Sequence, residues 1–245
     1  MTNARKIANV CIGITLITLI IFVVVILVLK YSVEGESNLP FEISKIILVS
    51  NSQGIDKEDT ENKWNFDLEQ NNDIYIYIQN NENYNRTEIL EKILLNNFSI
   101  PKEKDVGITK IYKPSENSNE LFANTEENEV TELEYVGESQ TNMKKLQISN
   151  QGGIIAFRVG NNNIGKYISN EGEEINHTQL LKMANIKEED LKQKIKFDIT
   201  LELKGGKKFK TTEEVNLPVE GIIDNGSANK EILELKDLIF KRIEN

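Results

Sequence analysis

Residues 197–219 read FDITLELKGGKKFKTTEEVNLPV and carry the clearest fold signal of the chain. Apolar and polar residues alternate strictly at the start of this stretch, which is typical of a β-strand with one buried face. Gly205 and Gly206 then separate it from a second segment of similar pattern, so the stretch predicts a β-hairpin. Pro218 ends the second strand, because proline has no backbone N–H to pair with a neighbouring strand.

Residues 41–50, FEISKIILVS, predict another strand, because aromatic and β-branched residues recur at alternate positions. The side chains expected to share one face are Phe41, Ile43, Lys45, Ile47 and Val49. The polar stretch 51–62 that follows predicts a loop.

Residues 63–70 and 73–79 predict a second hairpin, with the asparagine pair at 71–72 as its turn. The expected core-facing side chains are Trp64, Phe66, Leu68, Ile74, Ile76 and Ile78. Tyr75 and Tyr77 then lie on the opposite face of the second strand, because successive side chains of a strand point to opposite sides.

The remaining segments are mostly short. Strands are expected at 107–114, 132–137, 143–149, 153–159 and 164–169, with a turn at 160–163. Residues 177–195 predict a helix, with acidic residues early and basic residues late in KEEDLKQKI. Residues 85–100 fit a helix or a strand, and a strand that ends before Pro101 agrees better with the neighbouring strands. Residues 231–243 fit either a helix or two short strands.

Many short strands, separated by glycine and asparagine turns, indicate a mainly β fold. We expect residues 41–245 to form an antiparallel β-sandwich-like domain with one or two short helices. Two β-rich lobes are the alternative, with a boundary in the polar segment 115–131.

Residues 7–29 form an uncharged, strongly apolar run, IANVCIGITLITLIIFVVVILVL. As a helix this run would be about 34 Å long, enough to cross a bilayer core of about 30 Å. It is longer than the apolar region of a cleavable signal peptide. We therefore predict a single transmembrane helix at 7–29, a cytoplasmic N-terminus at 1–6 and a stalk at 30–40.

Flanking charge predicts the orientation. Arg5 and Lys6 precede the apolar run, whereas Lys30 alone follows it. A basic excess marks the cytoplasmic side, so the β-rich domain is expected outside the cell membrane. Lysine greatly outnumbers arginine, and isoleucine and asparagine are abundant, which is typical of AT-rich bacterial coding sequences. The expected location is therefore the bacterial cell envelope.

The charge of the domain disfavours nucleic acid as a partner. Of the 29 basic residues three lie within 1–30, so 26 basic residues face all 39 acidic ones, a net charge of −13. Such a domain repels phosphate backbones. The single cysteine, Cys11, lies within the apolar run, so no disulfide is expected in the domain.

Few residues predict catalysis, and no cofactor or metal site is expected. His177 is the single histidine, so a zinc site of nitrogen and sulfur ligands is not expected. Acidic residues cluster in two segments, at Asp56, Asp59 and Glu61 and at Glu171, Glu173 and Glu174. Neither cluster has the calcium-loop pattern, and solvated loops are the simpler interpretation, although a calcium site is a weaker alternative.

Four side chains are candidates for an interaction surface: Trp64, Tyr75, Tyr77 and Arg158. Aromatic side chains and arginine are enriched at protein interfaces. The simpler alternatives are that the tyrosines lie at the edge of a covered sheet and that Arg158 lies on a solvent face.

These observations predict a non-enzymatic, membrane-anchored binding module of the cell envelope. Its expected partners are the lipid bilayer, through residues 7–29, and an envelope protein or a wall polymer. The alternative is a hydrolase of envelope polymers that uses acidic residues, which would require two close carboxylates, one with a raised pKa.

Overall fold

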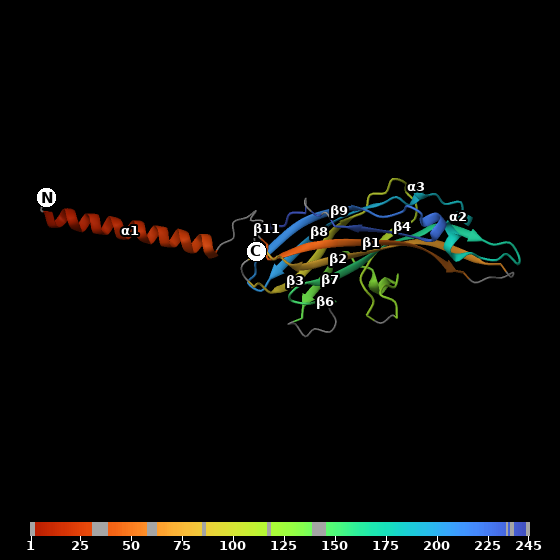
Figure 1. The fold of residues 1–245 in the computed structure, drawn as a ribbon, viewed down its shortest axis with the longest axis horizontal. Coiled ribbons are helices and arrows are strands. Elements are labelled where there is room, and N and C mark those ends of the chain that lie inside the picture. The colour runs from red at the N-terminus through yellow and green to blue at the C-terminus, as the bar shows by residue number, and fades with distance from the viewer. Residues whose placement is uncertain are drawn as a thin grey trace.

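The computed structural model describes residues 3–30, 39–57, 63–84, 87–116, 119–138, 146–233, 235 and 238–243, with side chains only at 12–25 in the first range. Two β-sheets form the body (Figure 1). Sheet A contains, in spatial order, β10 (Ser227–Ile232), β1 (Phe41–Asp56), β2 (Asn65–Asn80), β7 (Gly153–Ile168) and β4 (Ile108–Tyr112). Sheet B contains β11 (Lys241–Ile243), β9 (Lys208–Asn216), β8 (Lys194–Leu203), β3 (Leu90–Ser99), β5 (Leu133–Gly137) and β6 (Leu146–Ile148).

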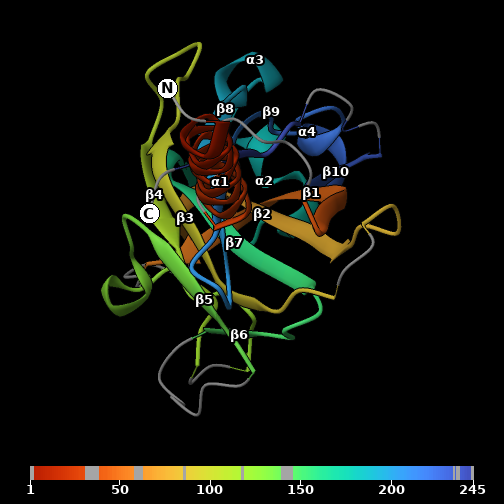
Figure 2. The same cartoon turned by 90° about the vertical axis from the view of Figure 1, so that its left-hand side faces the viewer.

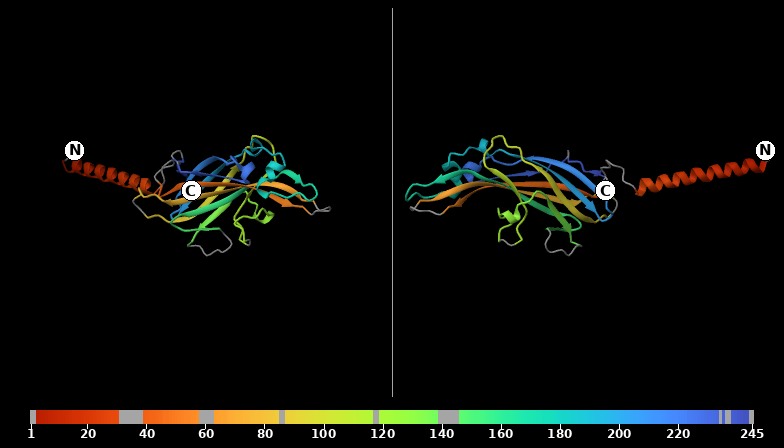
Figure 3. Two further views of the ribbon diagram at one scale, coloured as in Figure 1. Left: turned by 45° about the vertical axis from the view of Figure 1, so that its right-hand side comes forward. Right: turned by 180° about the vertical axis from the view of Figure 1, so that it is seen from behind.

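Helices are few and short apart from the first. The α-helices are α1 (Asn3–Lys30), α2 (Leu180–Met183), α3 (Glu188–Leu191) and α4 (Ile222–Asn225), and 3-10 turns cover Glu126–Asn128 and His177–Gln179. We call residues 177–191 and 222–225 together the helical cap. Both views of Figure 3 place α1 at one end of the body and the helical cap at the other.

The two sheets face each other and share a large apolar core. Figure 2, seen from the side of α1, separates the layer of β8, β9 and β3 from the layer of β1, β2 and β7. Phe157 of sheet A and Phe197 of sheet B meet edge to face at the centre, with ring centroids 5.2 Å apart. Phe98 packs against both rings. We call this end of the body, including the shared core, the sheet-covered half.

A second core lies under the helical cap. Strands β1, β2 and β7 have 16 residues each and extend beyond the end of sheet B. Their far ends pack against the cap through Phe66, Leu68, Ile164, Leu180, Leu181, Leu191 and Ile222, all of which are buried. We call this end the helix-covered half.

The mainly β prediction is confirmed, as is the hairpin signalled by Gly205 and Gly206, which joins β8 to β9. The ambiguous segment 85–100 contains the strand β3, and 231–243 contains the end of β10 and all of β11. The strand at 107–114 is confirmed as β4, and those at 132–137 and 143–149 as β5 and β6.

The face predicted for the first strand is wrong beyond Ile43. A register irregularity between Ile43 and Lys45 shifts the alternation by one position. Ile46 and Leu48 are therefore fully buried, whereas Ile47 and Val49 lie on the outer face. The predicted loop at 51–62 is also wrong in part, because β1 continues to Asp56 in register with β2.

The second predicted hairpin is wrong, because β2 runs through residues 71–72 without a turn. Asn72 is paired with Ser50 of β1 and with Val159 of β7, so neighbouring strands on both sides hold the asparagines extended. The turn predicted at 160–163 is wrong for the same reason. There β7 continues through an irregularity at which Asn163 has a φ of 57°.

Two further predictions need correction. Residues 177–195 do not form one helix: they contain a 3-10 turn, α2 and α3, and β8 begins at Lys194. Sheet B is not wholly antiparallel, because β5 and β6 pair in parallel. Of the predicted stalk at 30–40, residues 31–38 lie outside the described residues.

The first helix exposes apolar side chains on all sides. The large apolar residues from Ile12 to Val25 that are exposed range from 45% to 64% in fractional exposure. Within the described part of the chain, no helix meets the length and apolarity needed to cross a membrane.

Candidate functional site

A layer of polar side chains interrupts the inner face of sheet A between the two cores. Ser50, Gln70, Asn72 and Asn161 are all buried there, and we call them the polar layer. On β2 they continue the row of Phe66, Leu68, Ile74, Ile76 and Ile78, because every second residue of a strand faces the same side.

Most atoms of the polar layer are hydrogen-bonded. Ser50 Oγ donates to Asn72 Oδ1, and Gln70 Nε2 donates to the same oxygen at 3.3 Å. Asn72 Nδ2 donates to the carbonyl oxygen of Val159 at 3.2 Å. Gln70 Oε1 and Asn161 Nδ2 have no hydrogen-bond partner among the described residues. An unpaired buried polar atom costs about 1–3 kcal/mol, so the layer is less stable than an apolar one.

Lys102 joins the polar layer to the surface. Its ammonium donates to Asn161 Oδ1 at 3.0 Å and to the carbonyl oxygens of Val106 and Gly107 at 2.9 and 2.8 Å. All three acceptors are neutral, and no described carboxylate forms an ion pair with Lys102. Burial lowers the pKa of Lys102, although the charge of Asp105 opposes this shift.

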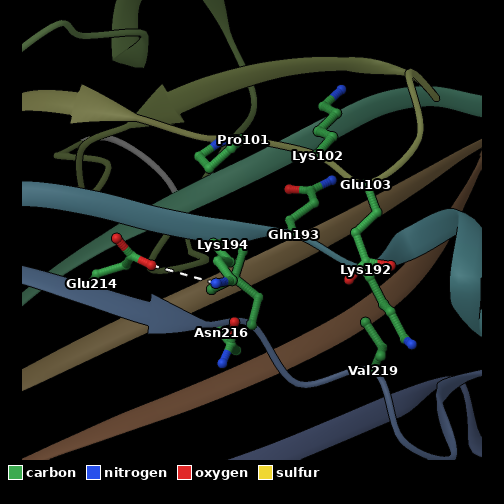
Figure 4. A pocket seen from close by; sticks show the side chains of 10 residues that line it. Pro101, Lys102, Glu103, Lys192, Gln193, Lys194, Glu214, Asn216 and Val219 are labelled. Atoms are coloured by element: carbon green, nitrogen blue, oxygen red, sulfur yellow. Dashed lines mark hydrogen bonds and ion pairs between the residues drawn. The ribbon is translucent and has the colours of Figure 1, made fainter.

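A pocket of 590 Å³, with Lys102 among its lining residues, lies where sheet B ends and the helical cap begins (Figure 4). Its wall is formed by residues 101–103, by residues 192–194, and by the end of β9 with the chain that follows it. Backbone hydrogen bonds hold the three segments together. Lys194 N–H donates to the Pro101 carbonyl at 3.2 Å, and Leu217 N–H donates to the Gln193 carbonyl at 3.0 Å.

Gln193 is the unusual member of the pocket wall. It is 4% exposed, and neither its amide nitrogen nor its amide oxygen has a hydrogen-bond partner among the described residues. In Figure 4 its amide lies next to the side chain of Lys102. Buried amides in folded proteins are nearly always paired with protein groups or with ordered water, so the unpaired amide of Gln193 is an exception.

Tyr75 and Tyr77 lie on the outer face of sheet A, as predicted from their alternation. Tyr75 is paired with Ile47 of β1, and Tyr77 with Ile154 of β7. Together with Val49 these side chains form what we call the tyrosine face. None of the five is buried, and Ile154 is 50% exposed. Burial against the sheet raises the pKa of Tyr75.

Lys45 lies at the rim of the tyrosine face. Its ammonium is 4.6 Å from the centre of the Tyr77 ring and 3.0 Å from Glu231 Oε1. The face therefore combines partly exposed aromatic and aliphatic side chains with a charged rim, the composition of many protein interfaces.

Arg158 lies on the same side of sheet A but is covered. Its guanidinium donates to both carboxylate oxygens of Asp73, at 2.6 and 3.0 Å. Phe122 lies over it at 5.0 Å, and Asn124 accepts a further bond at 3.4 Å. Only 13% of the Arg158 side chain is exposed, so it fastens the segment between β4 and β5 to sheet A.

Trp64 is remote from the tyrosines. It stacks on Phe66 with centroids 5.8 Å apart and is 47% exposed, at the end of the body formed by the start of β2. Thirteen positions separate Trp64 from Tyr77, about 40 Å along an extended strand. The four predicted interaction residues therefore do not form one surface.

The histidine and the acidic segments have local roles. His177 packs edge to face against Phe66, with centroids 5.7 Å apart. Glu173 accepts a 2.6 Å bond from the Tyr167 hydroxyl, and this bond raises the pKa of Tyr167 to about 12. Asp59 and Glu61 lie outside the described residues. Among the residues that are described, no group of three or more histidine, cysteine or acidic side chains is placed to hold a metal ion.

Comparison of the chain with protein-family models, with curated proteins and with solved structures found no match. The pocket was not predicted from the sequence. Its three segments are about 90 and 20 residues apart in the chain, and none has a local motif. The unusual run QNND at residues 70–73, inside an apolar region, was the only signal of the polar layer, and it resembles a turn.

Proposed function

We propose that the chain is a single-pass membrane protein of the bacterial cell envelope, with a β-sandwich-like binding module outside the membrane. The observation that carries this proposal is the exposed surface of α1. Its large apolar side chains on every side, from Ile12 to Val25, are exposed to 45% or more, and such a helix is poorly soluble in water. The charge-free run at 7–29 and the basic residues before it support a helix that crosses the membrane with its N-terminus inside.

The tyrosine face supports binding of a protein partner. Partly exposed tyrosines and the exposed Ile154 on a regular sheet present a rigid surface, and aromatic side chains carry much of the energy in protein interfaces. The face lies in the sheet-covered half, the end of the body from which the chain leads to α1. A partner bound there would lie near the membrane.

The alternative, a hydrolase, receives less support. The pocket contains two carboxylates, Glu103 and Glu214, and the second forms an ion pair with Lys194 at 3.5 Å. Burial raises the pKa of Glu213 to about 7, but this residue follows the alternation of buried Thr211 and Val215 and points away from Glu214.

Membrane attachment is tested by fractionating cells that express the full chain or a variant without residues 1–30. We expect the full chain in the membrane fraction until detergent is added, and the shortened chain in the soluble fraction. Protease added to intact cells should digest the β-rich domain. Recovery of the full chain in the soluble fraction would refute the anchor, and protection from protease would reverse the orientation.

Partner binding is tested with a photo-crosslinking residue at position 77 or, as the matched control, at position 196. Tyr77 belongs to the tyrosine face, whereas Lys196 is exposed on the outer side of sheet B. We expect a protein adduct from position 77 only. A carbohydrate adduct would instead indicate a wall polymer, and equal labelling from both positions would refute a specific face.

A further inference from the structure

The pocket between sheet B and the helical cap has features of a ligand site, independently of membrane attachment. It lies where residues 101–103 and residues 192–194 meet the end of β9 and the chain that follows it. Its volume of 590 Å³ is in the range of small-molecule sites, which are about 300–1,000 Å³.

The residues that line this pocket include three lysines and two glutamates, a net charge of +1, although the domain as a whole is acidic. The ammonium of Lys102 is bound by neutral acceptors alone. Lys192 is exposed and forms no ion pair with a described residue, while Lys194 has only a 3.5 Å contact with Glu214. Against these three lysines stand Glu103 and the paired Glu214. Charge of one sign in a concave site concentrates the field and attracts ligands of the opposite sign.

Gln193 is the second and independent observation. Its amide is buried in the wall with one donor group and one acceptor unpaired. Leaving it so reduces stability, because both polar atoms have lost water and gained no partner. A ligand in the pocket could be reached by rotation of this one side chain, and rotamer changes of this kind are common on binding.

From these observations, we propose that the pocket binds a small organic anion. Its carboxylate or phosphate group lies at Lys192, close to the field of Lys102, and its polar atoms pair with the amide of Gln193. The apolar side chains of Leu217 and Val219 contact the remainder of the ligand.

The test is calorimetric titration of the full chain in detergent with inorganic phosphate and, separately, with citrate at constant ionic strength. We expect saturable binding of at least one probe. Binding of phosphate alone would indicate a ligand with a phosphoryl group, and binding of citrate alone would indicate a carboxylate ligand. Binding of both would indicate a site for anions in general. The absence of saturable binding for both probes would overturn the proposal.

Two lysine variants locate the site. Lys192→Ala should weaken binding by up to about fivefold, the effect of losing one ion pair at an exposed site. Lys182→Ala is the matched control, because it removes the same charge from the helical cap, where Lys182 is paired with Asp224 at 2.7 Å. Equal losses in the two variants would mean that net charge alone attracts the probe, and would overturn the site.

A third variant tests the role of the amide. Gln193→Leu removes both unpaired polar atoms with little change of shape. We expect a higher midpoint of thermal unfolding without ligand and weaker binding of the probe. A lower midpoint would show that the amide is already paired in the free protein, and an unchanged affinity would show that it does not contact the ligand.

Discussion

The two halves of the body are built on the same three strands but are closed in different ways. In the sheet-covered half, the inner face of sheet A meets a second sheet whose strands are joined by continuous backbone ladders. In the helix-covered half, it meets helices of four residues each, which would not persist alone. The second half therefore depends on side-chain burial under the cap, and we expect it to open more easily than the first.

The largest expected difference comes from removing one aromatic ring from each core. Phe157→Ala should lower the free energy of unfolding of the whole domain by about 3–5 kcal/mol, because its ring joins sheet A to Phe98 and Phe197 of sheet B. Phe66→Ala should mainly reduce hydrogen-exchange protection in the helical cap. Denaturant unfolding and hydrogen exchange measure the two effects. Equal loss of protection in both halves after Phe66→Ala would show that they unfold as one unit.

Tyr135 gives a sharper test of how the sheet-covered half is closed. Its hydroxyl accepts from the Ala156 N–H at 2.9 Å and donates to the Ala156 carbonyl at 2.6 Å, so it pairs both groups at the edge of β7. Tyr135→Phe should cost about 1–3 kcal/mol in denaturant unfolding, because these groups are left buried and unpaired. Tyr77→Phe is the control and should change stability little. Equal effects would mean that water replaces the hydroxyl.

Acid should weaken the sheet-covered half through Asp198. Burial alone would raise its pKa, but hydrogen bonds from Asn97, Lys210 and Thr212 outweigh this and lower the pKa to about 2. The lowered pKa means that the carboxylate stabilises the fold above its ordinary value of 3.8 and that this is lost as the pH falls toward 2.

The variant Asp198→Asn should therefore lose about 1–2 kcal/mol at pH 7 and show a flatter dependence between pH 5 and pH 2. Unfolding curves at several pH values provide the measurement. Asp224→Asn changes an exposed carboxylate of the helical cap and should leave the acid slope unchanged. An unchanged slope in Asp198→Asn as well would assign acid sensitivity to other groups.

The smallest effect is expected at Glu213, in the same half. Burial raises its pKa to about 7 from an ordinary value of 4.5, so the folded state favours the neutral carboxyl. Wild-type stability should consequently fall as the pH rises from about 4.5 to 7. Glu213→Gln should remove this fall and be about 1 kcal/mol more stable at pH 8, allowing for partial exposure.

Comparing the unfolding midpoints at pH 5 and pH 8 measures the effect of Glu213. Glu220→Gln, at an exposed position, serves as the control for charge removal. If the unfolding midpoint at pH 8 rises by the same amount in both variants, the gain in stability comes from the lower net charge of the domain rather than from the burial of Glu213.

The sequence predicts the sheet-covered half better than the helix-covered half. Strict alternation identifies β8 and β9, because each has one apolar and one polar face. Alternation fails at Ile43 because a single-residue irregularity exchanges the faces, and such a shift has no distinct composition.

The middle of sheet A could not be predicted for a different reason. Asparagine favours turns in isolation, but at Asn72 and Asn161 strands on both sides supply the hydrogen bonds that keep the chain extended. The pocket is harder still, because Lys102 and Gln193 come together only through the arrangement of the strands. Prediction of such a site requires the topology rather than the local pattern.

The three long strands also determine how far apart two exposed surfaces of the body lie. A strand of 16 residues at about 3.3 Å per residue extends about 53 Å, so β1, β2 and β7 each run through both halves of the body. Trp64 directly precedes β2, and Ile168 ends β7 opposite Asn65, so these two exposed side chains lie at the same end of the paired strands. The molecule therefore presents the tyrosine face and, about four nanometres farther along the strands, a second and separate exposed site.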